Sequence, residues 1–387
     1  MTVPTLEVSG ARLRTVDKEI LRLIHQRMMI GLDVVRFKKL TGGKIVRPEI
    51  ESERIQEAGE FANEIGLNAD FARTIQHMMI GESCKLQIEF LQSEAIRTLP
   101  VDPNERYQVL KQNLIRLTEA VATKYTSSGG NKYPATQLYV DYENEHILSR
   151  IKQLGKGCLT KALDLGCAAG RTSKFLAPHF ETVVGYDISQ DMINTAWQRC
   201  EAVTPTIKNV TFIQHDLDLG IPEEDSSVDM IVMGLGTASD MANLPYILSE
   251  ISRVLKTGGE FVLSFYNKDA LIYTPDFISI DPSLNARINI DENCLQIFVP
   301  PSINDDGVTV SGAEYLIYAR AYDWGEIETM VRSPLRIHYY RTHPTLASIT
   351  PRILLENPQL TQTMSRLEKT LEYGGAGAYY LISGIKE

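Results

Sequence analysis

The chain has 387 residues, a length that suggests two or three domains. Of these residues 43% are hydrophobic and 23% charged, which are globular proportions that exclude collagen-like and wholly disordered classes. Its 39 basic and 49 acidic residues give a formal net charge of -10 without a basic run, so we expect no nucleic-acid partner. No apolar stretch approaches the roughly 18 residues that would span a bilayer, and the N-terminus lacks the features of a signal peptide. We therefore expect a cytoplasmic protein with no membrane partner.

Cysteine and histidine spacing gives no metal-site pattern. None of the cysteines forms a C-x-x-C pair, and their number is odd, which predicts neither a disulfide framework nor a zinc site. Only His338 and His343 lie close together among the histidines, at a spacing that fits no helical ligand pair. We expect no metal. The cysteines are Cys84, Cys158, Cys167, Cys200 and Cys294.

The first part of the chain, from residue 7 to about 97, is predicted to be helical because apolar side chains recur at intervals of three and four. The segment TGGKIVRPEI contains two glycines and a proline and so ends the first helix. A shorter helix, Glu49–Ile65, is closed by Gly66. The pattern predicts a bundle of a long, a short and a long helix. The stripe on the first helix is Leu13, Val16, Ile20, Leu23, Ile24, Gly31 and Val34.

A helical linker is predicted for residues 98–130, with its helix at about 105–124 and the linker-like segment TSSGGNKYP after it. From 131 to 387 the pattern changes to short apolar runs that alternate with helical segments, which is typical of a doubly wound parallel sheet. Two late runs, LRIHYYR and AYYLISGIK, are predicted to close the sheet as an antiparallel edge pair. The five parallel runs are KALDLG, ETVVGYD, VTFIQHD, VDMIVMG and GEFVLSFYN.

Polar residues interrupt the apolar faces of the helical part. Arg27 falls on the stripe of the first helix, and Lys38 follows four residues after Val34. Two cations on an inward stripe predict an anionic ligand, because a buried unpaired charge is costly. Ser83 and Gln87, one turn apart on the third helix, add polar groups to the same apolar interior, as in a small-molecule site.

Residues 7–97 resemble the all-helical chorismate mutases of the AroQ type, in the RTVDKEILRLIHQRM run, the Lys38 position, and the RPEIESER and ESCKLQ segments. The resemblance implies that Arg27 clamps substrate carboxylates and that Lys38 and Gln87 stabilise charge on the ether oxygen. It also implies that Glu53 contacts the substrate hydroxyl and that Ser83 adds a polar contact. Such enzymes are interlocked dimers, so a homodimer is expected.

Two positions depart from that family, because this chain has Gly10 and Ser52 where the family has arginines. Arg12 or Arg14 could substitute for the first. Losing one charge-assisted clamp costs on the order of 1.5–3 kcal/mol. Three interpretations of the bundle therefore stay open: an active mutase, a dimerisation or ligand-sensing module, and a site for another small anion.

The segment ALDLGCAAGR predicts a strand that ends near Asp164, a turn with Gly166 and Gly170, and a helix from about Arg171. Such a turn lies at the carboxyl edge of a sheet, where these folds bind nucleotides. The second strand ends in Asp187, whose carboxylate can accept both hydroxyls of a ribose. His215-Asp216 closes the third strand.

The D-x-G-x-x-x-G pattern, these closing acids and VLKTGGEFVLSFYN resemble the class I S-adenosylmethionine-dependent methyltransferases over residues 130–387. The resemblance implies S-adenosyl-L-methionine as cofactor and S-adenosyl-L-homocysteine as product. It places the methionine part at the glycine turn, the ribose at Asp187 and the adenine amino group at Asp216. Ala168 stands where the family usually has glycine. The implied cofactor residues are Asp164, Gly166, Cys167, Gly170, Asp187, Ile188, Met192, Asp216, Leu217 and Met233.

Methyl transfer needs mainly alignment, and no base stands out in the sequence. The candidates kept for proton transfer are Tyr142, His146 and His338; Tyr139, Tyr266 and His343 are further possibilities.

The fusion predicts a small-molecule methyltransferase that acts on a chorismate-derived or similar carboxylic acid. One alternative is a carboxy-S-adenosylmethionine synthase that uses prephenate, in which Arg171 or Arg199 would hold the extra carboxylate. Another is a methyltransferase with an inactive mutase-like dimerisation module.

Overall fold

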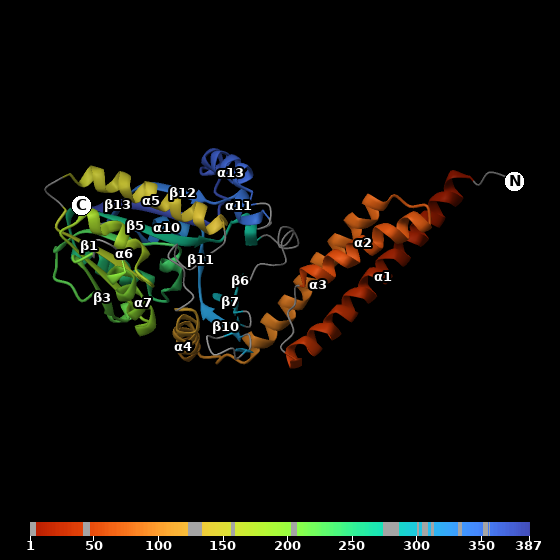
Figure 1. Ribbon diagram of the computed structural model, residues 1–387, viewed down its shortest axis with the longest axis horizontal. Helices are drawn as coiled ribbons and strands as arrows, with labels where there is room; N and C mark the ends of the chain where they lie inside the picture. The colour runs from red at the N-terminus through yellow and green to blue at the C-terminus, as the bar shows by residue number, and fades with distance from the viewer. Residues whose placement is uncertain are drawn as a thin grey trace. The chain divides into compact units, whose positions relative to one another are not determined.

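A computed structural model describes residues 5–41, 47–122, 134–155, 159–202, 207–273, 286–299, 302–303, 309–310, 313–331, 335–350, 355 and 357–387. Cys158 and most of TSSGGNKYP lie outside these ranges. The chain divides into two compact units (Figure 1). The first comprises Met1–Thr98, Ile278–Asn285 and Phe298–Ala313, and the second comprises Leu99–Phe277, Ala286–Ile297 and Glu314–Glu387.

The first unit contains the predicted long, short and long helices, α1 (Leu6–Thr41), α2 (Pro48–Glu64) and α3 (Ala69–Arg97). Pro48 starts α2, where a missing N–H leaves no helical bond unmade. After Gly66, which has a positive φ of 76°, Asn68 caps α3 by accepting the N–H of Phe71 at 2.8 Å. The helical prediction is confirmed. Two short strands, β8 (Ser302–Ile303) and β9 (Thr309–Val310), also cluster with this unit.

The core of the three helices covers only part of α1. Met28 and Val35 of α1 are buried together with Ile80 and Ile88 of α3. The N-terminal part of the predicted stripe is different: Leu13, Val16, Ile20 and Leu23 are each 49–64% exposed in the single chain. That half of the stripe therefore contributes no core to its own chain.

The second unit is built on an eight-stranded sheet, in which β1 to β5 run parallel and the predicted edge pair is antiparallel. The doubly wound prediction is confirmed. β11 (Ala321–Tyr322) also pairs with β5. The order of the remaining strands is β12 (Leu335–His343), β13 (Tyr379–Lys386), β5 (Leu255–Asn267), β4 (Val228–Met233), β1 (Lys161–Leu165), β2 (Thr182–Asp187) and β3 (Val210–Gln214).

Helices cover both faces of this sheet (Figure 1). One face packs on α5 (Pro134–Leu154), α6 (Arg171–Leu176) and α7 (Gln190–Glu201) through residues such as Ile147 and Ile193. The other packs on α8 (Leu244–Val254) and α10 (Trp324–Met330). Residues buried on both faces explain the continuous apolar runs of the parallel strands.

The remaining elements of the second unit surround the sheet. α4 (Pro103–Val121), predicted as a linker helix, packs against α7. A small second sheet contains β10 (Ala313–Tyr318), β7 (Cys294–Val299) and β6 (Ala286–Asn289). The others are η3 (Ala177–His179), η4 (Leu217–Leu219), η5 (Thr237–Asp240), η6 (Leu271–Tyr273), α11 (Leu346–Ile349) and α13 (Pro358–Leu371).

Candidate functional sites

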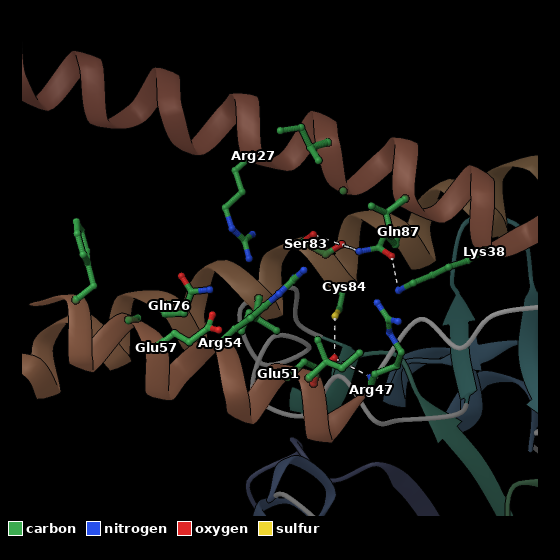
Figure 2. Close-up of a pocket in the computed structure, with 17 residues that line it drawn as sticks. Arg27, Lys38, Arg47, Glu51, Arg54, Glu57, Gln76, Ser83, Cys84 and Gln87 are labelled. Carbon is green, nitrogen blue, oxygen red and sulfur yellow. Dashed lines mark hydrogen bonds between the residues drawn. The ribbon is translucent and has the colours of Figure 1, made fainter.

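A cavity of about 640 Å³ lies between the three helices of the first unit. It is lined by four basic side chains and two acidic ones, together with Ser83, Cys84 and Gln87 (Figure 2). The excess of positive charge suits a small molecule with more than one negative charge. The charged lining residues are Arg27, Lys38, Arg47, Glu51, Arg54 and Glu57.

The structure brings four of the predicted residues together in this cavity, namely Arg27, Lys38, Ser83 and Gln87. The Gln87 amide is oriented by its neighbours: its nitrogen donates to the Ser83 carbonyl at 3.1 Å and to Oγ at 3.2 Å, and its oxygen accepts from Lys38 Nζ at 3.2 Å. Arg27 donates to the Met79 carbonyl at 2.7 Å. The polar groups on α1 and α3 are therefore held in place by the protein itself.

The basic residues of the cavity disfavour one another's charge. Burial and then the Arg54 guanidinium lower the pKa of Arg27, and burial and then the Arg47 guanidinium lower the pKa of Lys38. Nearby positive charges have this effect when no anion balances them. A bound carboxylate would reverse it, so the electrostatics also point to an anionic ligand.

Glu53 does not line the cavity and is exposed, so its predicted place there is corrected. The cavity face of α2 consists of residues three or four apart, which include Glu51 and Arg54, and Arg47 at the N-cap extends it. Glu53 lies about 100° away from Arg54 around the helix. Ser52 is also exposed. Ser52 stands where the resembled family has an arginine, and in this chain Arg47 and Arg54 supply positive charge to the cavity instead. The helical spacing of residues around Pro48 is a sequence signal that could reveal them.

At the carboxyl edge of β1, the predicted turn brings the backbone close to the loop after β4. Gly166 and Gly170 have φ of 73° and 76°, and a Cβ on Gly166 would lie 2.4 Å from Thr237 Cγ2. Ala168 takes a positive φ of 42°, which explains why a glycine is usual there. The N–H groups of Gly166 and Cys167 donate to the Tyr186 carbonyl. The turn is thus anchored to β2.

The two predicted acids at strands β1 and β2 are buried and have hydrogen-bond partners. Asp164 accepts from Ser173 Oγ at 2.6 Å, and burial raises its pKa to about 6. Asp187 accepts from the N–H of Ala168 at 2.8 Å and of Ser189 at 2.9 Å, and burial raises its pKa. Because each carboxylate oxygen can accept more than one hydrogen bond, Asp187 can position the turn and still accept from a ribose.

Beyond β3, Asp216 and Asp218 both accept from Lys111 of α4, at 2.5–2.7 Å. Asp216 therefore lies at the expected edge, but it already has a cationic partner that the sequence did not suggest. Leu217 between the two acids is buried in the core.

Four predicted cofactor residues differ in what their side chains can offer. Met192 is 1% exposed and packs with Ala169, and Ile188 is half-buried. Cys167 and Met233 point into opposite cores of the sheet, so only their backbones can face the edge. Burial also raises the pKa of the Cys167 thiol well above its usual range.

This edge has unsatisfied acceptors. Within the described part of the chain, one buried oxygen of Asp218 and one of Asp240 have no hydrogen-bond partner. Burial and then Asp187 raise the pKa of Asp240 to about 8. Unpaired acceptors, five nearby aspartates and a close-fitting glycine turn fit a cationic ligand that carries hydroxyl donors, as S-adenosyl-L-methionine does. Asp240 was not predicted, although its position after the fourth strand is a usable signal.

Two of the candidate bases lie away from the carboxyl edge. His146 bonds Ser383 at 2.8 Å and stacks on Tyr339, and burial lowers its pKa to about 4. Ser383 pairs with Val262, which lies in the middle of β5. His338 is exposed near the start of β12, at the opposite end from His343. Both histidines are therefore corrected as candidates for proton transfer.

The tyrosines are closer to the edge but serve packing. Tyr142 donates to Glu372 at 3.0 Å, lies 2.6 Å from the Tyr339 hydroxyl and stacks on His343, and burial raises its pKa. Tyr139 bonds Ser264, whose Oγ also accepts the N–H of Gly236 at 2.9 Å. The structure thus offers no preformed base among these residues.

A buried ion pair that the sequence did not reveal connects α5 to this edge. Glu143 is fully buried; it accepts from the N–H of Leu235 at 2.9 Å and from Arg171 at 3.0 Å. Leu235 follows β4, and Arg171 starts α6 immediately after the glycine turn. Glu143 therefore fixes the two loops on either side of the methionine end of the expected cofactor site.

Comparison with known proteins bears on both sites. Residues 11–88 match the family model described as chorismate mutase type II, and residues 162–259 match the one described as a methyltransferase domain. The chain carries both domains.

Relatives of the methyltransferase domain include a probable S-adenosylmethionine-dependent methyltransferase of Saccharomyces cerevisiae, 25% identical over 194 residues, which are 49% of this chain. Another is a demethylmenaquinone methyltransferase of Tropheryma whipplei, 30% identical over 145 residues, 37% of this chain. The matches span 62% and 58% of those proteins. A solved structure, the CcbJ methyltransferase of Streptomyces caelestis, is 13% identical with a TM-score of 0.43, over 63% of this chain and 89% of that one.

The mutase domain contains the cationic cavity, and the methyltransferase domain contains the acidic carboxyl edge. None of the described helices is long and apolar enough to cross a membrane.

Proposed function

We propose that this protein is an S-adenosyl-L-methionine-dependent methyltransferase that acts on a small carboxylic acid, chorismate-derived or similar. The observation that carries this proposal is the combination in one chain of a cationic cavity in a mutase domain and an acidic, under-satisfied edge in a methyltransferase domain. The first suits a small anion and the second suits a sulfonium cofactor. A fusion of the two suggests that one domain makes or gathers what the other methylates.

At the methyltransferase edge, the residues would act mainly by positioning. The cofactor supplies an activated methyl group, so that alignment accounts for most of the rate. Asp187 would accept from the ribose hydroxyls while holding the turn at Ala168, and Glu143 would keep the loops around the methionine end in register. The absence of a preformed base at Tyr139, Tyr142, His146 and His338 favours an acceptor that is already ionised, such as a carboxylate.

In the mutase domain, we propose that the cavity binds a dicarboxylate of the chorismate class. Four basic and two acidic side chains leave a formal excess of two positive charges, which a dianion would neutralise. Arg54 and Arg47 compensate for the arginine missing at Ser52. Lys38 and the oriented Gln87 amide would lie beside the ether oxygen that gains charge as the C–O bond breaks.

We further propose that the protein is a homodimer through α1. The exposed stripe of Leu13, Val16, Ile20 and Leu23 would gain a partner. Gly10 precedes Arg27 by 17 residues, about 25 Å along the helix, so a residue near it could complete only the cavity of another chain.

Size-exclusion chromatography with light scattering tests the dimer. The double change Leu13→Ser and Ile20→Ser should convert a dimer to a monomer. The control Val101→Ser, at an exposed valine outside the helix, should leave the mass unchanged. A monomeric wild type would refute this proposal.

The carboxy-S-adenosylmethionine alternative needs a cation for the extra carboxylate. Arg171, one of its candidates, is paired with the fully buried Glu143, so this geometry favours methyl transfer.

The decisive experiment incubates the full chain with chorismate, with and without S-adenosyl-L-methionine, and identifies every product by mass. A methylated acid together with S-adenosyl-L-homocysteine supports the proposal. A carboxylated cofactor supports the alternative, and no chorismate loss would reduce the mutase domain to a dimerisation or sensing module.

A further inference from the structure

Helix α4 contacts the cofactor edge of the methyltransferase domain at two separate points. Near its middle, Lys111 Nζ lies 2.6 and 2.7 Å from the two oxygens of Asp216 and 2.5 Å from Asp218 Oδ2. At its end, Val121 and Ala122 pack against Ala168 and Ala169 of the glycine turn and against Met192 of α7. One helix thus reaches from the residue expected at the adenine amino group to the residues expected at the turn.

The other side of α4 is fastened to the second sheet. Arg106 forms an ion pair with Glu292, and Asn113 donates to the Leu316 carbonyl at 2.9 Å. Tyr107, which lies on the same face of α4 as Lys111, also packs edge-on against Tyr318, with ring centroids 5.2 Å apart. Leu110 is also almost fully buried. α4 is therefore braced from outside and has the packing of a structural element of this domain.

Lys111 provides the polar contacts on the inner side. Its side chain is only 13% exposed, and it neutralises two acids whose side chains are 31% and 20% exposed. Tyr107 donates to the same oxygen of Asp218. Without the lysine, the two acids would face α4 with no countercharge, and the cost of keeping unpaired carboxylates partly buried under the helix would favour its separation from the edge.

A bound adenine need not displace Lys111. An ammonium has three donors. Asp216 Oδ1 already accepts from Lys111 and from the N–H of Asp218, whereas Oδ2, which accepts from Lys111, can take a second hydrogen bond. The adenine amino group can therefore share Asp216 with Lys111 while Lys111 keeps Asp218. The contact can persist with the ligand beneath it.

We propose that α4 is the cover of the adenosine half of the cofactor site and that Lys111 is the positioning residue that holds this cover closed. The inference rests on the proposed use of S-adenosyl-L-methionine at this edge. It makes cofactor exchange depend on release of α4, so that Lys111 sets how long cofactor and product stay bound.

The test measures the rate at which S-adenosyl-L-homocysteine dissociates from the full chain, by stopped-flow competition. Lys111→Met should accelerate dissociation about ten-fold, the effect of losing one charge-assisted contact. Lys111→Arg, which keeps the charge, should restore most of the wild-type rate. The matched control is Lys161→Met, which removes a similar lysine–glutamate pair at the start of β1 and should leave the rate unchanged.

Hydrogen exchange of the amides of residues 103–121 gives a second readout that a merely structural role would not move. S-adenosyl-L-homocysteine should slow this exchange in the wild type and much less in Lys111→Met. If Lys111→Met does not fold, Tyr107→Phe, which removes only one bond to Asp218, should still accelerate dissociation about two-fold to three-fold.

The cover would be refuted if dissociation from every folded variant were as slow as from the wild type, or if α4 exchange did not respond to the ligand. A wild type that does not bind S-adenosyl-L-homocysteine at all would instead refute the proposed function, and the cover with it. The two failures are therefore distinguishable.

Discussion

The cavity of the mutase domain and the edge of the methyltransferase domain are built with opposite charge. In the cavity, burial and then the neighbouring guanidinium groups of Arg54 and Arg47 lower the pKa values of Arg27 and Lys38. At the edge, burial raises the pKa values of Asp187 and Asp240, and the Asp187 carboxylate adds to the shift of Asp240. The difference teaches that each site lacks what its ligand would supply. The cavity lacks negative charge, and the edge lacks positive charge and hydrogen-bond donors.

The largest effect is expected from Asp187→Ala. This change removes the acceptor that we propose for two ribose hydroxyls and also the anchor of the Ala168 N–H, so the affinity for S-adenosyl-L-homocysteine should fall about 100-fold. Isothermal titration calorimetry measures it. The exposed Asp225, changed in the same way, serves as the control and should bind as the wild type does. Equal affinities of the two variants would place the ribose elsewhere.

A smaller effect separates two adjacent residues of α2. Arg54→Ala removes one cation of the cavity and should weaken chorismate binding about ten-fold, whereas Glu53→Ala should change it less than about two-fold. Fluorescence-monitored titration of the full chain compares them. The reverse ranking would show that the dimer or the ligand rotates α2 relative to the face seen in this structure.

The smallest effect concerns stability without ligand. The pKa of Asp240 is about 8 in the folded chain, whereas the ordinary value is 3.8. Between these pH values the folded state therefore binds more protons than the unfolded state, and the free energy of unfolding falls as the pH rises through this window. Asp240→Asn should remove this fall and raise the free energy of unfolding at high pH by about 1 kcal/mol relative to the wild type.

Urea unfolding at about pH 5 and about pH 9 measures that difference. The matched variant Asp269→Asn, at an exposed aspartate after β5, should show the wild-type pH dependence. An Asp240 variant that also behaves as the wild type would mean that this carboxyl is ionised and solvated in the apo protein.

Local patterns predicted the elements well because their causes are local. Glycines at Gly166 and Gly170 were placed in the turn, since positive φ is a property of single residues, and the strand runs were identified by their length and apolarity. Arg27 and Lys38 could be predicted as one pair and Ser83 and Gln87 as another, because helical spacing puts each pair on one face of its own helix.

Other site residues could not be predicted in this way. The role of Glu53 comes from alignment with the family's sequence pattern. Whether Glu53 or Arg54 faces the cavity depends instead on the rotation of α2 about its axis when it packs against α3. Lys111 meets Asp216 across 105 residues and Glu143 meets Leu235 across 92, so no local signal could have indicated either contact. His146 resembled a base in the sequence and is instead packed against β13.

The sequence by itself therefore determined two domains, their order, the helix and strand pattern, the glycine turn and the acids that close the strands. Only the tertiary structure decided which charges converge: four cations in a cavity of three helices, and a lysine of α4 on the acids beyond β3. The physical reason is that backbone conformation and periodicity are set within a few residues, whereas the electrostatics of a site depend on burial and on partners that are distant along the chain.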